Sequence, residues 1–281
     1  MKNRLSSLFL YCCCMTSLFA NNEQSQLSFG VVPQQSAKTL AAKWGPVFDR
    51  WSQESGIKIK FVTAKNIPTF EERLLQGKYD IAYMNPYHYV LYHQAAGYLA
   101  MAREQDRLLQ GIIVVHKDSH IYDLEDLQKV DMAFPAPASF AATIIPLANL
   151  AKMNISTKAT FVYSHDSVYL NVAKGFFKAG GGVMRTLKST PAGVQDKLRV
   201  VWKSEGFTPH AIASHPRVSD ETREKLLSAL ERLQKDDNFM QLLRDLNLNP
   251  FVRAQVNDWD SIKDLNIIGI TDHLAPPMRV N

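Results

Sequence analysis

Residues 79–97 read YDIAYMNPYHYVLYHQAAG and contain one complete strand-to-helix unit. The apolar run Tyr79–Met84 is typical of a buried strand. Asn85 is a favoured helix cap, Pro86 suits the first helical turn, and Gly97 suits the residue after a helix. The stretch therefore predicts a strand, a short corner and a helix in that order.

The same alternation of short apolar strands and amphipathic helices repeats on both sides of this unit. It indicates an α/β fold with mainly parallel sheets. We expect strands at 27–32, 58–63, 79–84, 111–116, 132–134, 160–163, 198–202 and 210–214, and helices at 40–51, 68–77, 87–96, 139–152, 166–174, 219–234, 238–246 and 261–265.

The order of these elements predicts two α/β lobes joined by two crossovers. The chain begins one α/β unit, inserts a second, and ends in helices with no strands between them. We therefore expect a first lobe made of 27–116 and 210–272 and a second lobe made of 117–209. The crossovers are expected near His116–Asp118 and Pro209–Ala211.

Residues 1–20 differ in composition from the rest of the chain. Lys2 and Arg4 precede an apolar and small-residue stretch that ends at Ala20. This is the pattern of a secretory signal peptide, so we expect cleavage near Ala20 and a periplasmic protein. All three cysteines, Cys12–Cys14, lie in this segment. The mature chain is then free of cysteine and needs no disulfide.

The charge pattern argues against a nucleic-acid partner. The chain has 32 Lys and Arg against 27 Asp and Glu, and its formal net charge of +5 falls by two, to +3, without Lys2 and Arg4. The two signs are interspersed, which is typical of a solvated surface with a mild preference for anions. No second apolar run reaches the roughly 20 residues of a membrane span.

A first candidate site lies at Pro135–Ser139, which joins a predicted strand to a helix with Ala141 and Ala142 in its first turn. The start of a helix offers unpaired backbone N–H groups and the positive end of the helix dipole, and Ser139 adds a hydroxyl. Small residues let an oxyanion approach the backbone. An anion site and an ordinary Ser139 cap both fit this pattern.

A second corner of this kind is Tyr163–Asp166. His165 can donate a hydrogen bond to an anion, while Asp166 caps the next helix. A structural histidine also fits, but two such corners of one lobe open on the same sheet edge, which favours a binding site. A triad of Ser139, His165 and Asp166 is the enzymatic alternative. There is no G-x-S-x-G elbow, and adjacent His and Asp side chains diverge at a helix start, so we expect no enzyme.

Several short segments follow one another in a familiar order between Phe29 and Val252. Their order and spacing resemble those of the phosphate-, phosphite- and phosphonate-binding periplasmic proteins of ABC importers. That resemblance implies a type II periplasmic binding fold, in which two α/β lobes close on a ligand, and an inner-membrane permease and ATPase as partners. The matching segments are FGVVP at 29–33, WGP at 44–46, GKYDIAY at 77–83, HKDS at 116–119, DLEDL at 123–127, Ser139 with Pro146, SH at 164–165 and VWKS at 201–204.

The resemblance also suggests site residues. In that family a Ser-Thr-Ser-Gly turn at a helix start and a histidine contact the phosphonate oxygens. Ser139 matches the first serine and His165 the histidine, whereas Phe140, Ala141 and Ala142 stand where Thr, Ser and Gly are expected. Two hydroxyl donors are therefore lost. The remaining candidate donors are Thr143, Arg185 and Thr186.

Other positions depart from the family in a way that concerns the ligand. Lys178 stands where a phosphonate-binding member carries an acid for its ligand's amine, and Ile67 and Leu109 replace two tyrosines. An aminoalkylphosphonate is then a poor fit, because no acid pairs with its ammonium group.

We therefore expect a monomeric solute-binding protein of an ABC importer that holds phosphate, phosphite or a phosphonate between its lobes, without a metal or cofactor. The expected ligand-binding residues are Ser139, Phe140, Ala141, Thr143, His165, Lys178 and Arg185. A sensory binding protein of the same fold is one alternative. A ferric-iron binder is another, because tyrosines and histidines gather at 83–93 and both can ligate ferric iron.

Overall fold

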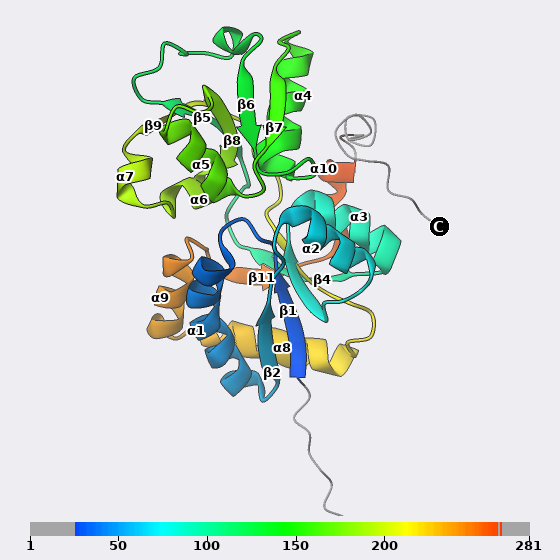
Figure 1. Cartoon of the computed structure of the whole chain (residues 1–281). Helices are drawn as coiled ribbons and strands as arrows, with labels where there is room; N and C mark the ends of the chain where they lie inside the picture. Colours follow the sequence, from blue (N-terminus) through cyan, green and yellow to red (C-terminus); the bar gives the residue numbers. More distant parts are fainter. Residues whose placement is uncertain (1–25, 264, 266–281) are drawn as a thin grey trace, which may run out of the picture.

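The computed structural model describes residues 26–263 and 265, and in it the chain forms two α/β lobes, each built on its own sheet (Figure 1). The expected signal peptide at 1–20, its cleavage near Ala20 and the first-lobe residues 266–272 lie outside the described residues. So does residue 264 of the helix expected at 261–265. Within the described part, no helix is both long enough and apolar enough to cross a membrane.

The first sheet has the strand order β11-β4-β10-β3-β1-β2. Strands β1, β2 and β3 are parallel, whereas β10 is antiparallel to both β3 and β4, and β11 is antiparallel to β4. The chain thus returns from the second lobe into the middle of the first sheet. The strands are β1 Gln26–Val31, β2 Lys58–Val62, β3 Ile81–Met84, β4 Leu99–Glu104, β10 Ala211–Ser214 and β11 Phe251–Arg253.

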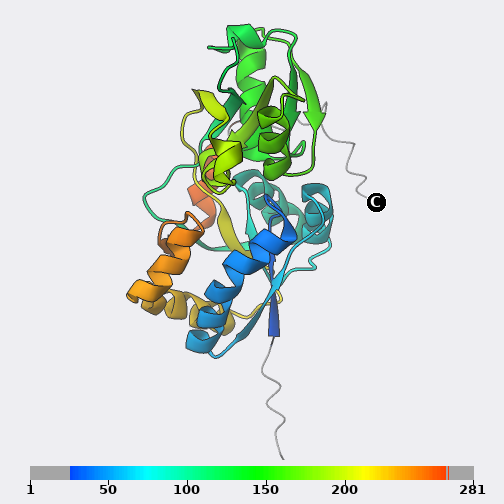
Figure 2. The same ribbon diagram turned by 60° about the vertical axis from the view of Figure 1, so that its left-hand side comes forward.

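Helices from both ends of the described chain cover this sheet. The longest, α1, begins where the Ser36 hydroxyl accepts the Thr39 N–H at 3.1 Å, and its buried face runs from Leu40 to Trp51. It packs against α8 and α9, as Figure 2 shows. The N-terminal and C-terminal parts therefore share one core. The helices are α1 Ala37–Ser55, α2 Ile67–Leu75, α3 Pro86–Ala96, α8 Asp220–Leu233, α9 Asp237–Asp245 and α10 Asp260–Lys263, with a 3-10 turn at Val256–Trp259.

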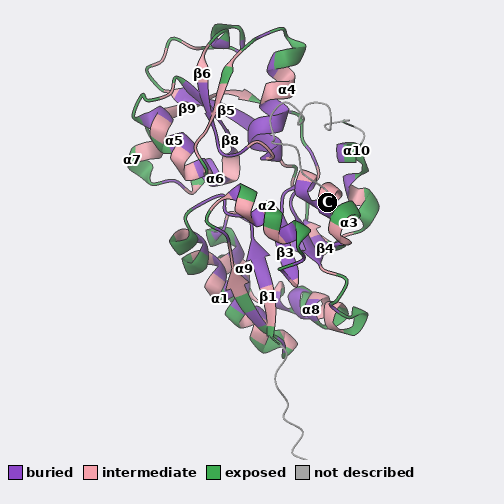
Figure 3. Cartoon of the chain, turned by 45° about the vertical axis from the view of Figure 1, so that its right-hand side comes forward, coloured by how far each residue is buried: buried purple, intermediate pink, exposed green. Residues whose placement is uncertain are grey.

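The second sheet has the order β7-β6-β8-β5-β9. Strands β6, β7 and β8 are parallel, and β5 is antiparallel to β8 and β9. Along β5, Ile112 and Val114 face one apolar cluster while Ile113 and Val115 face the other. Both faces of this sheet are therefore buried (Figure 3). The strands are β5 Gly111–His116, β6 Asp131–Phe134, β7 Lys158–Phe161, β8 Ala179–Val183 and β9 Leu198–Lys203.

The strand pairing differs in one place from the order expected from the sequence. We had placed 111–116 in the first lobe, but β5 pairs only with strands of the second sheet. The chain therefore leaves the first sheet after Glu104, and it crosses before β5 rather than near His116–Asp118. The reason is that strand pairing is a long-range property, and an apolar run such as GIIVVH is compatible with either sheet.

The second lobe also contains an irregular helix that matters for the site. The helix expected at 139–152 begins with a π-helical turn, Phe140–Ile144, and continues as α4, Ile145–Lys152. A widened turn of this type is rare and occurs often at functional sites. The other helices of this lobe are α5 His165–Ala173, α6 Met184–Lys188 and α7 Ala192–Gln195, with a 3-10 turn at Glu125–Leu127.

Candidate ligand-binding site

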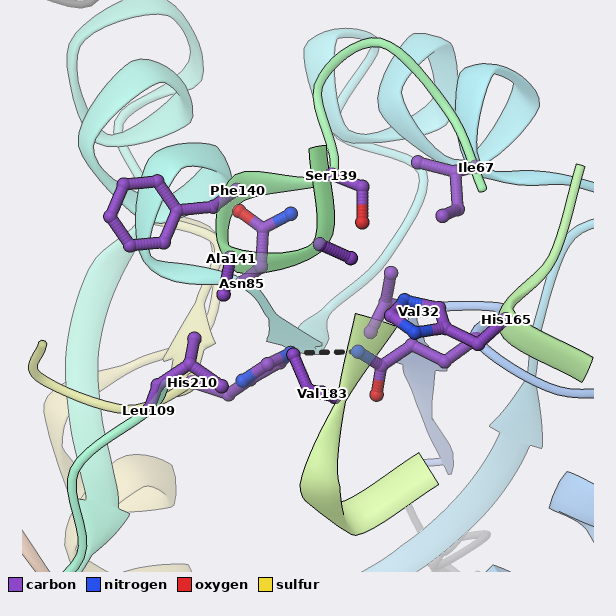
Figure 4. Close-up of a pocket in the computed structure, with 12 residues that line it drawn as sticks. Val32, Ile67, Asn85, Leu109, Ser139, Phe140, Ala141, His165, Val183 and His210 are labelled. Carbon is purple, nitrogen blue, oxygen red and sulfur yellow. Dashed lines mark hydrogen bonds between the residues drawn. The ribbon is translucent and has the colours of Figure 1, made fainter. Parts of the chain in front are cut away.

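A small cavity lies where the ends of strands from both sheets face each other. The centre of a water molecule can occupy a volume of about 10 Å³ in it. This is close to the minimum for a cavity that holds one water. Figure 4 shows Ser139, Asn85, His165 and His210 around this space. The first lobe contributes Val32, Gln34, Ile67, Asn85 and His210, the second contributes Ser139, Phe140, Ala141, Ala142, His165 and Val183, and Leu109 comes from the first crossover.

The π-helical turn forms one wall of the cavity. Within it, the Ser139 carbonyl accepts the N–H groups of Thr143 at 2.7 Å and Ile144 at 3.3 Å. The N–H groups of Phe140, Ala141 and Ala142 have no acceptor within the helix, because the helix begins at Phe140. Since the helix runs on to Lys152, its positive end also lies here. The wall therefore offers backbone donors to an anion.

Glycines of the sheet allow this turn to lie where it does. A Cβ atom on Gly181 of β8 would stand 1.9 Å from the Ala142 carbonyl oxygen, and one on Gly111 of β5 would stand 2.1 Å from that of Ala141. Neither distance is possible for real atoms. The Gly180–Gly182 run, for which the sequence predicted no strand, is the central part of β8, and the missing side chain of Gly181 makes room for the turn.

His165 forms the opposite wall, at the start of α5. Its Nδ1 lies 3.1 Å from the Thr186 hydroxyl, while its Nε2 is buried and has no hydrogen-bond partner. Burial, and then the positive charge of Arg185, lower the pKa of His165 to about 3. The ring is therefore neutral, and the proton it carries lies on either Nδ1 or Nε2.

The neighbours of Thr186 allow that proton to lie on Nε2. Tyr169 and Thr186 each have one hydroxyl proton, and both oxygens lie 3.0 Å from the Val183 carbonyl. When Tyr169 donates to Val183, the Thr186 proton is free to go to Nδ1 of His165. Nε2 then carries the ring proton and is a neutral donor directed at the cavity.

Two polar residues of the first lobe reach across to the second. Asn85 caps α3 by accepting the His88 N–H at 2.8 Å, and its amide nitrogen donates to the Ala138 carbonyl at 3.2 Å. Gln34 accepts the His165 N–H on its backbone oxygen at 3.0 Å. These contacts join the strand ends of the first lobe to both helix starts of the second.

Arg185 lies behind the cavity and does not line it. Its guanidinium donates to the Gln34 side-chain oxygen at 2.7 Å, to the Tyr83 hydroxyl, and to Glu104 at 3.4 Å. Because the Gln34 side-chain oxygen accepts from Arg185, the Gln34 side-chain nitrogen faces Nε2 of His210 at 3.4 Å, as the dashed line in Figure 4 shows. His210 then carries its proton on Nδ1. All of these partners belong to the first lobe.

The structure brings together only part of the residue set expected from the sequence. Ser139, Phe140, Ala141 and His165 line the cavity. Thr143 is buried in the same turn and its hydroxyl has no partner, but it is not part of the lining.

Lys178 does not join this group. It is exposed and lines a separate pocket of the second lobe with His116 and His120. It precedes β8, whose far end at Val183 reaches the cavity, so about 16 Å of strand separates it from the site. We correct two expectations accordingly: Lys178 is remote from the cavity, and Arg185 contacts the first lobe rather than the cavity.

Sequence analysis missed three polar lining residues, Gln34, Asn85 and His210. Gln34 and Asn85 follow β1 and β3 at corners equivalent to those of the second lobe, so their position was a usable signal. His210 stands at the expected second crossover, which places it between the lobes. Ile67 and Leu109, which we had noted only as replaced tyrosines, also line the cavity.

Comparison with known proteins identifies the family of this chain. The model of the family described as "ABC transporter, phosphonate, periplasmic substrate-binding protein" matches residues 29–259. The chain belongs to this family. Members are binding components of transporters and not enzymes, and they work with a membrane permease and an ATPase.

Individual relatives of this family member are distant. The phosphonates-binding periplasmic protein of Escherichia coli is 24% identical over 88% of this chain and 77% of its own length. The phosphate-import protein PhnD of Mycolicibacterium smegmatis is 22% identical over 71% of this chain and 69% of its own. The structure of PhnD1 from Prochlorococcus marinus with methylphosphonate has a TM-score of 0.78 at 17% identity, covering 88% of this chain and 99% of that one. The likeness confirms the type II periplasmic binding fold.

The site does not assemble the triad of Ser139, His165 and Asp166 that we considered as the enzymatic alternative. His165 is oriented by Thr186, not by Asp166, whose carboxylate instead accepts the Ser36 N–H at 3.4 Å. Nε2 of His165 has no partner, so it does not activate the Ser139 hydroxyl. A nucleophilic triad is therefore not assembled.

Proposed function

We propose that the protein, as a monomer in the periplasm, captures a small phosphorus oxyanion in the cavity between its lobes and presents it to an ABC permease. Phosphate, phosphite and short phosphonates are the proposed ligands. One observation carries the proposal: the buried Nε2 of His165 has no partner, and it faces the same cavity as the free backbone donors of the π-helical turn. An oxyanion supplies acceptors for both.

The number of donors is sufficient for useful affinity. Ser139, the backbone of the turn and His165 offer four or more hydrogen bonds to an anion. At about 2 kcal/mol for each charge-assisted bond, they reach the roughly 8 kcal/mol that corresponds to a micromolar Kd. The cavity has room for about one water, so the lobes would have to part to admit a tetrahedral anion, and their closure around it would signal occupancy.

The aromatic cluster at 83–93 does not favour the ferric-iron alternative. Iron requires a phenolate, but burial raises the pKa of Tyr89 to about 12 and also raises the pKa values of Tyr83 and Tyr92. The Tyr83 ring is stacked on His210 at 5.0 Å, and Tyr89 packs on Trp259 at 4.4 Å. Among the described residues, His, Cys, Asp and Glu nowhere gather in groups of three that could hold a metal.

Isothermal titration calorimetry with methylphosphonate, phosphite and phosphate tests the proposal. We expect micromolar binding of at least one of them, and a loss of tenfold or more, equivalent to about 1.4 kcal/mol, in His165→Ala. His165→Gln keeps a donor and should lose less. His120→Ala is the matched control, because His120 is exposed and remote from the cavity. A folded wild-type protein that binds none of the three anions would refute the proposal.

A further inference from the structure

A second cavity adjoins the proposed binding cavity. The two share Leu109, Val183 and His210 as lining residues, so these side chains separate them. About 170 Å³ of the second cavity is open to the centre of a water molecule, against about 10 Å³ of the first. The second cavity is therefore large enough for a substituent that the first excludes.

The second cavity carries an excess of positive charge. Three cations line it, Arg107, Arg185 and Lys188, together with one acid, Glu104. Glu104 is 2% exposed, and both of its oxygens are occupied: one lies 3.4 Å from Arg185, and the other 3.1 Å from Arg107. The second oxygen also accepts the Asn249 N–H at 3.1 Å. The acid is thus committed to existing partners and is not available to a ligand.

Lys188 differs from the other two cations because Arg107 and Arg185 are both paired with Glu104. It is exposed, and it makes no ion pair with any described residue. An ammonium group entering this cavity would meet three cations and no available carboxylate. A carboxylate would meet Lys188 directly, with Arg107 on the same lining.

We propose that the second cavity is a subsite for an anionic substituent, and that the ligands include phosphonates with a carboxylate on a short alkyl chain. This inference rests on the proposed function, because the phosphonate group must occupy the first cavity. The alkyl chain would pass between Leu109 and Val183, whose side chains are apolar. Leu109 is only partly buried, so its side chain has room to move aside.

Titrations with three phosphonates test the subsite: methylphosphonate, 3-phosphonopropionate and 2-aminoethylphosphonate. We expect 3-phosphonopropionate to bind about fivefold more tightly than methylphosphonate, which is the upper range for one exposed ion pair. We expect 2-aminoethylphosphonate to bind most weakly. Lys188→Gln should remove most of the advantage of 3-phosphonopropionate and leave methylphosphonate unchanged. Lys178→Gln is the control, because Lys178 is an exposed lysine of the same lobe outside both cavities.

The outcomes separate this proposal from the proposed function. Failure of the wild-type protein to bind any phosphonate, phosphite or phosphate overturns the function itself. If methylphosphonate binds but 3-phosphonopropionate gains nothing over it, the function stands and the subsite is wrong. The subsite is also wrong if Lys188→Gln and Lys178→Gln change the ratio of the two affinities equally, or if 2-aminoethylphosphonate binds more tightly than the carboxylate.

Discussion

The substitution Arg185→Met tests whether Arg185 holds the second lobe against the first. Arg185 belongs to α6 of the second lobe, whereas its partners Gln34, Tyr83 and Glu104 all belong to the first. Its side chain is 14% exposed and that of Glu104 is 2% exposed. Methionine keeps most of the side-chain volume but removes every polar contact that the Arg185 side chain makes with Gln34, Tyr83 and Glu104.

The expected loss of stability follows from these contacts. Removing one partner of a buried ion pair costs about 3–5 kcal/mol. Glu104 keeps Arg107 at 3.1 Å, so we expect the lower end of that range, about 3 kcal/mol. At about 2–4 °C per kcal/mol for a chain of this size, Tm should fall by about 6–12 °C. The protein should also be more open without ligand, because the lobes lose a contact that joins them.

Thermal unfolding and small-angle X-ray scattering measure these two effects. Arg244→Met is the control, since Arg244 is exposed on α9 and contacts only the Gln241 side chain, at 2.9 Å; a change below about 0.5 kcal/mol is expected there. Glu104→Gln combined with Arg185→Met should recover part of the loss, because the buried carboxylate is then neutral. If Arg185→Met lowers Tm no more than Arg244→Met does, Arg185 does not hold the lobes together.

Two further predictions concern the turn and the histidines. Gly181→Ala places a methyl group 1.9 Å from the Ala142 carbonyl oxygen, so we expect a loss of about 1–3 kcal/mol in unfolding free energy and weaker anion binding. Gly193→Ala, with no atom within 4 Å of the new Cβ, should be neutral or slightly stabilising, and equal melting temperatures of the two variants would contradict the close packing. Burial lowers the pKa values of His165 and His210, so the unfolded chain binds protons below about pH 6.5 that the folded protein does not. The unfolding free energy is therefore unaffected by these two rings above that pH. Below it, the unfolding free energy falls by about 1.4 kcal/mol per pH unit for each ring, down to about pH 3 for His165. Denaturant titrations from pH 7 to 4 give the unfolding free energy at each pH. Its slope against pH should be smaller in His165→Gln by the equivalent of one proton, and an unchanged slope would contradict a lowered pKa for His165.

Local signals in the sequence predicted most elements because the signals themselves are local. Asn85 caps α3 and Gly97 ends it in the left-handed conformation, as predicted, whereas the cap expected at Asp166 is wrong: Ser164 caps α5, and Asp166 lies in its first turn. Ser139 and His165 could be chosen for the same reason, since each stands at a strand-to-helix corner. Their meeting at one cavity follows from β6 and β7 being parallel neighbours.

What the sequence did not predict depends on contacts between distant residues. The glycines of β8 disfavour a strand by propensity, yet they pair with β5 and β6, and neighbouring groups fill the space of their side chains: the Ala142 carbonyl at Gly181, Val168 at Gly180 and Tyr169 at Gly182. Arg185 looked like an anion ligand until its partner Glu104 was located 81 residues away. Lys178 directly precedes β8, whereas Val183 is its last residue and lines the cavity. Lys178 is therefore a strand's length from the cavity, although it is close to Val183 in the sequence.

If the proposed function is right, the replacement of the serine-rich turn that the resemblance implies changes how selectivity arises in this protein. Phe140, Ala141 and Ala142 are buried, and Phe140 packs edge-to-face on Phe207 at 5.1 Å. Such a turn would bind through backbone N–H groups, which serve any oxyanion equally well. Selectivity would then come from the rest of the lining: Ile67 and Leu109 provide apolar surfaces, and Glu104, the one acid among the described residues that line the second cavity, is already paired and so favours an ammonium group less than it would if free to bind one. The backbone of the turn would thus bind the anion, and other residues such as Ile67 and Leu109 would select among anions. A substitution could then change one property without the other.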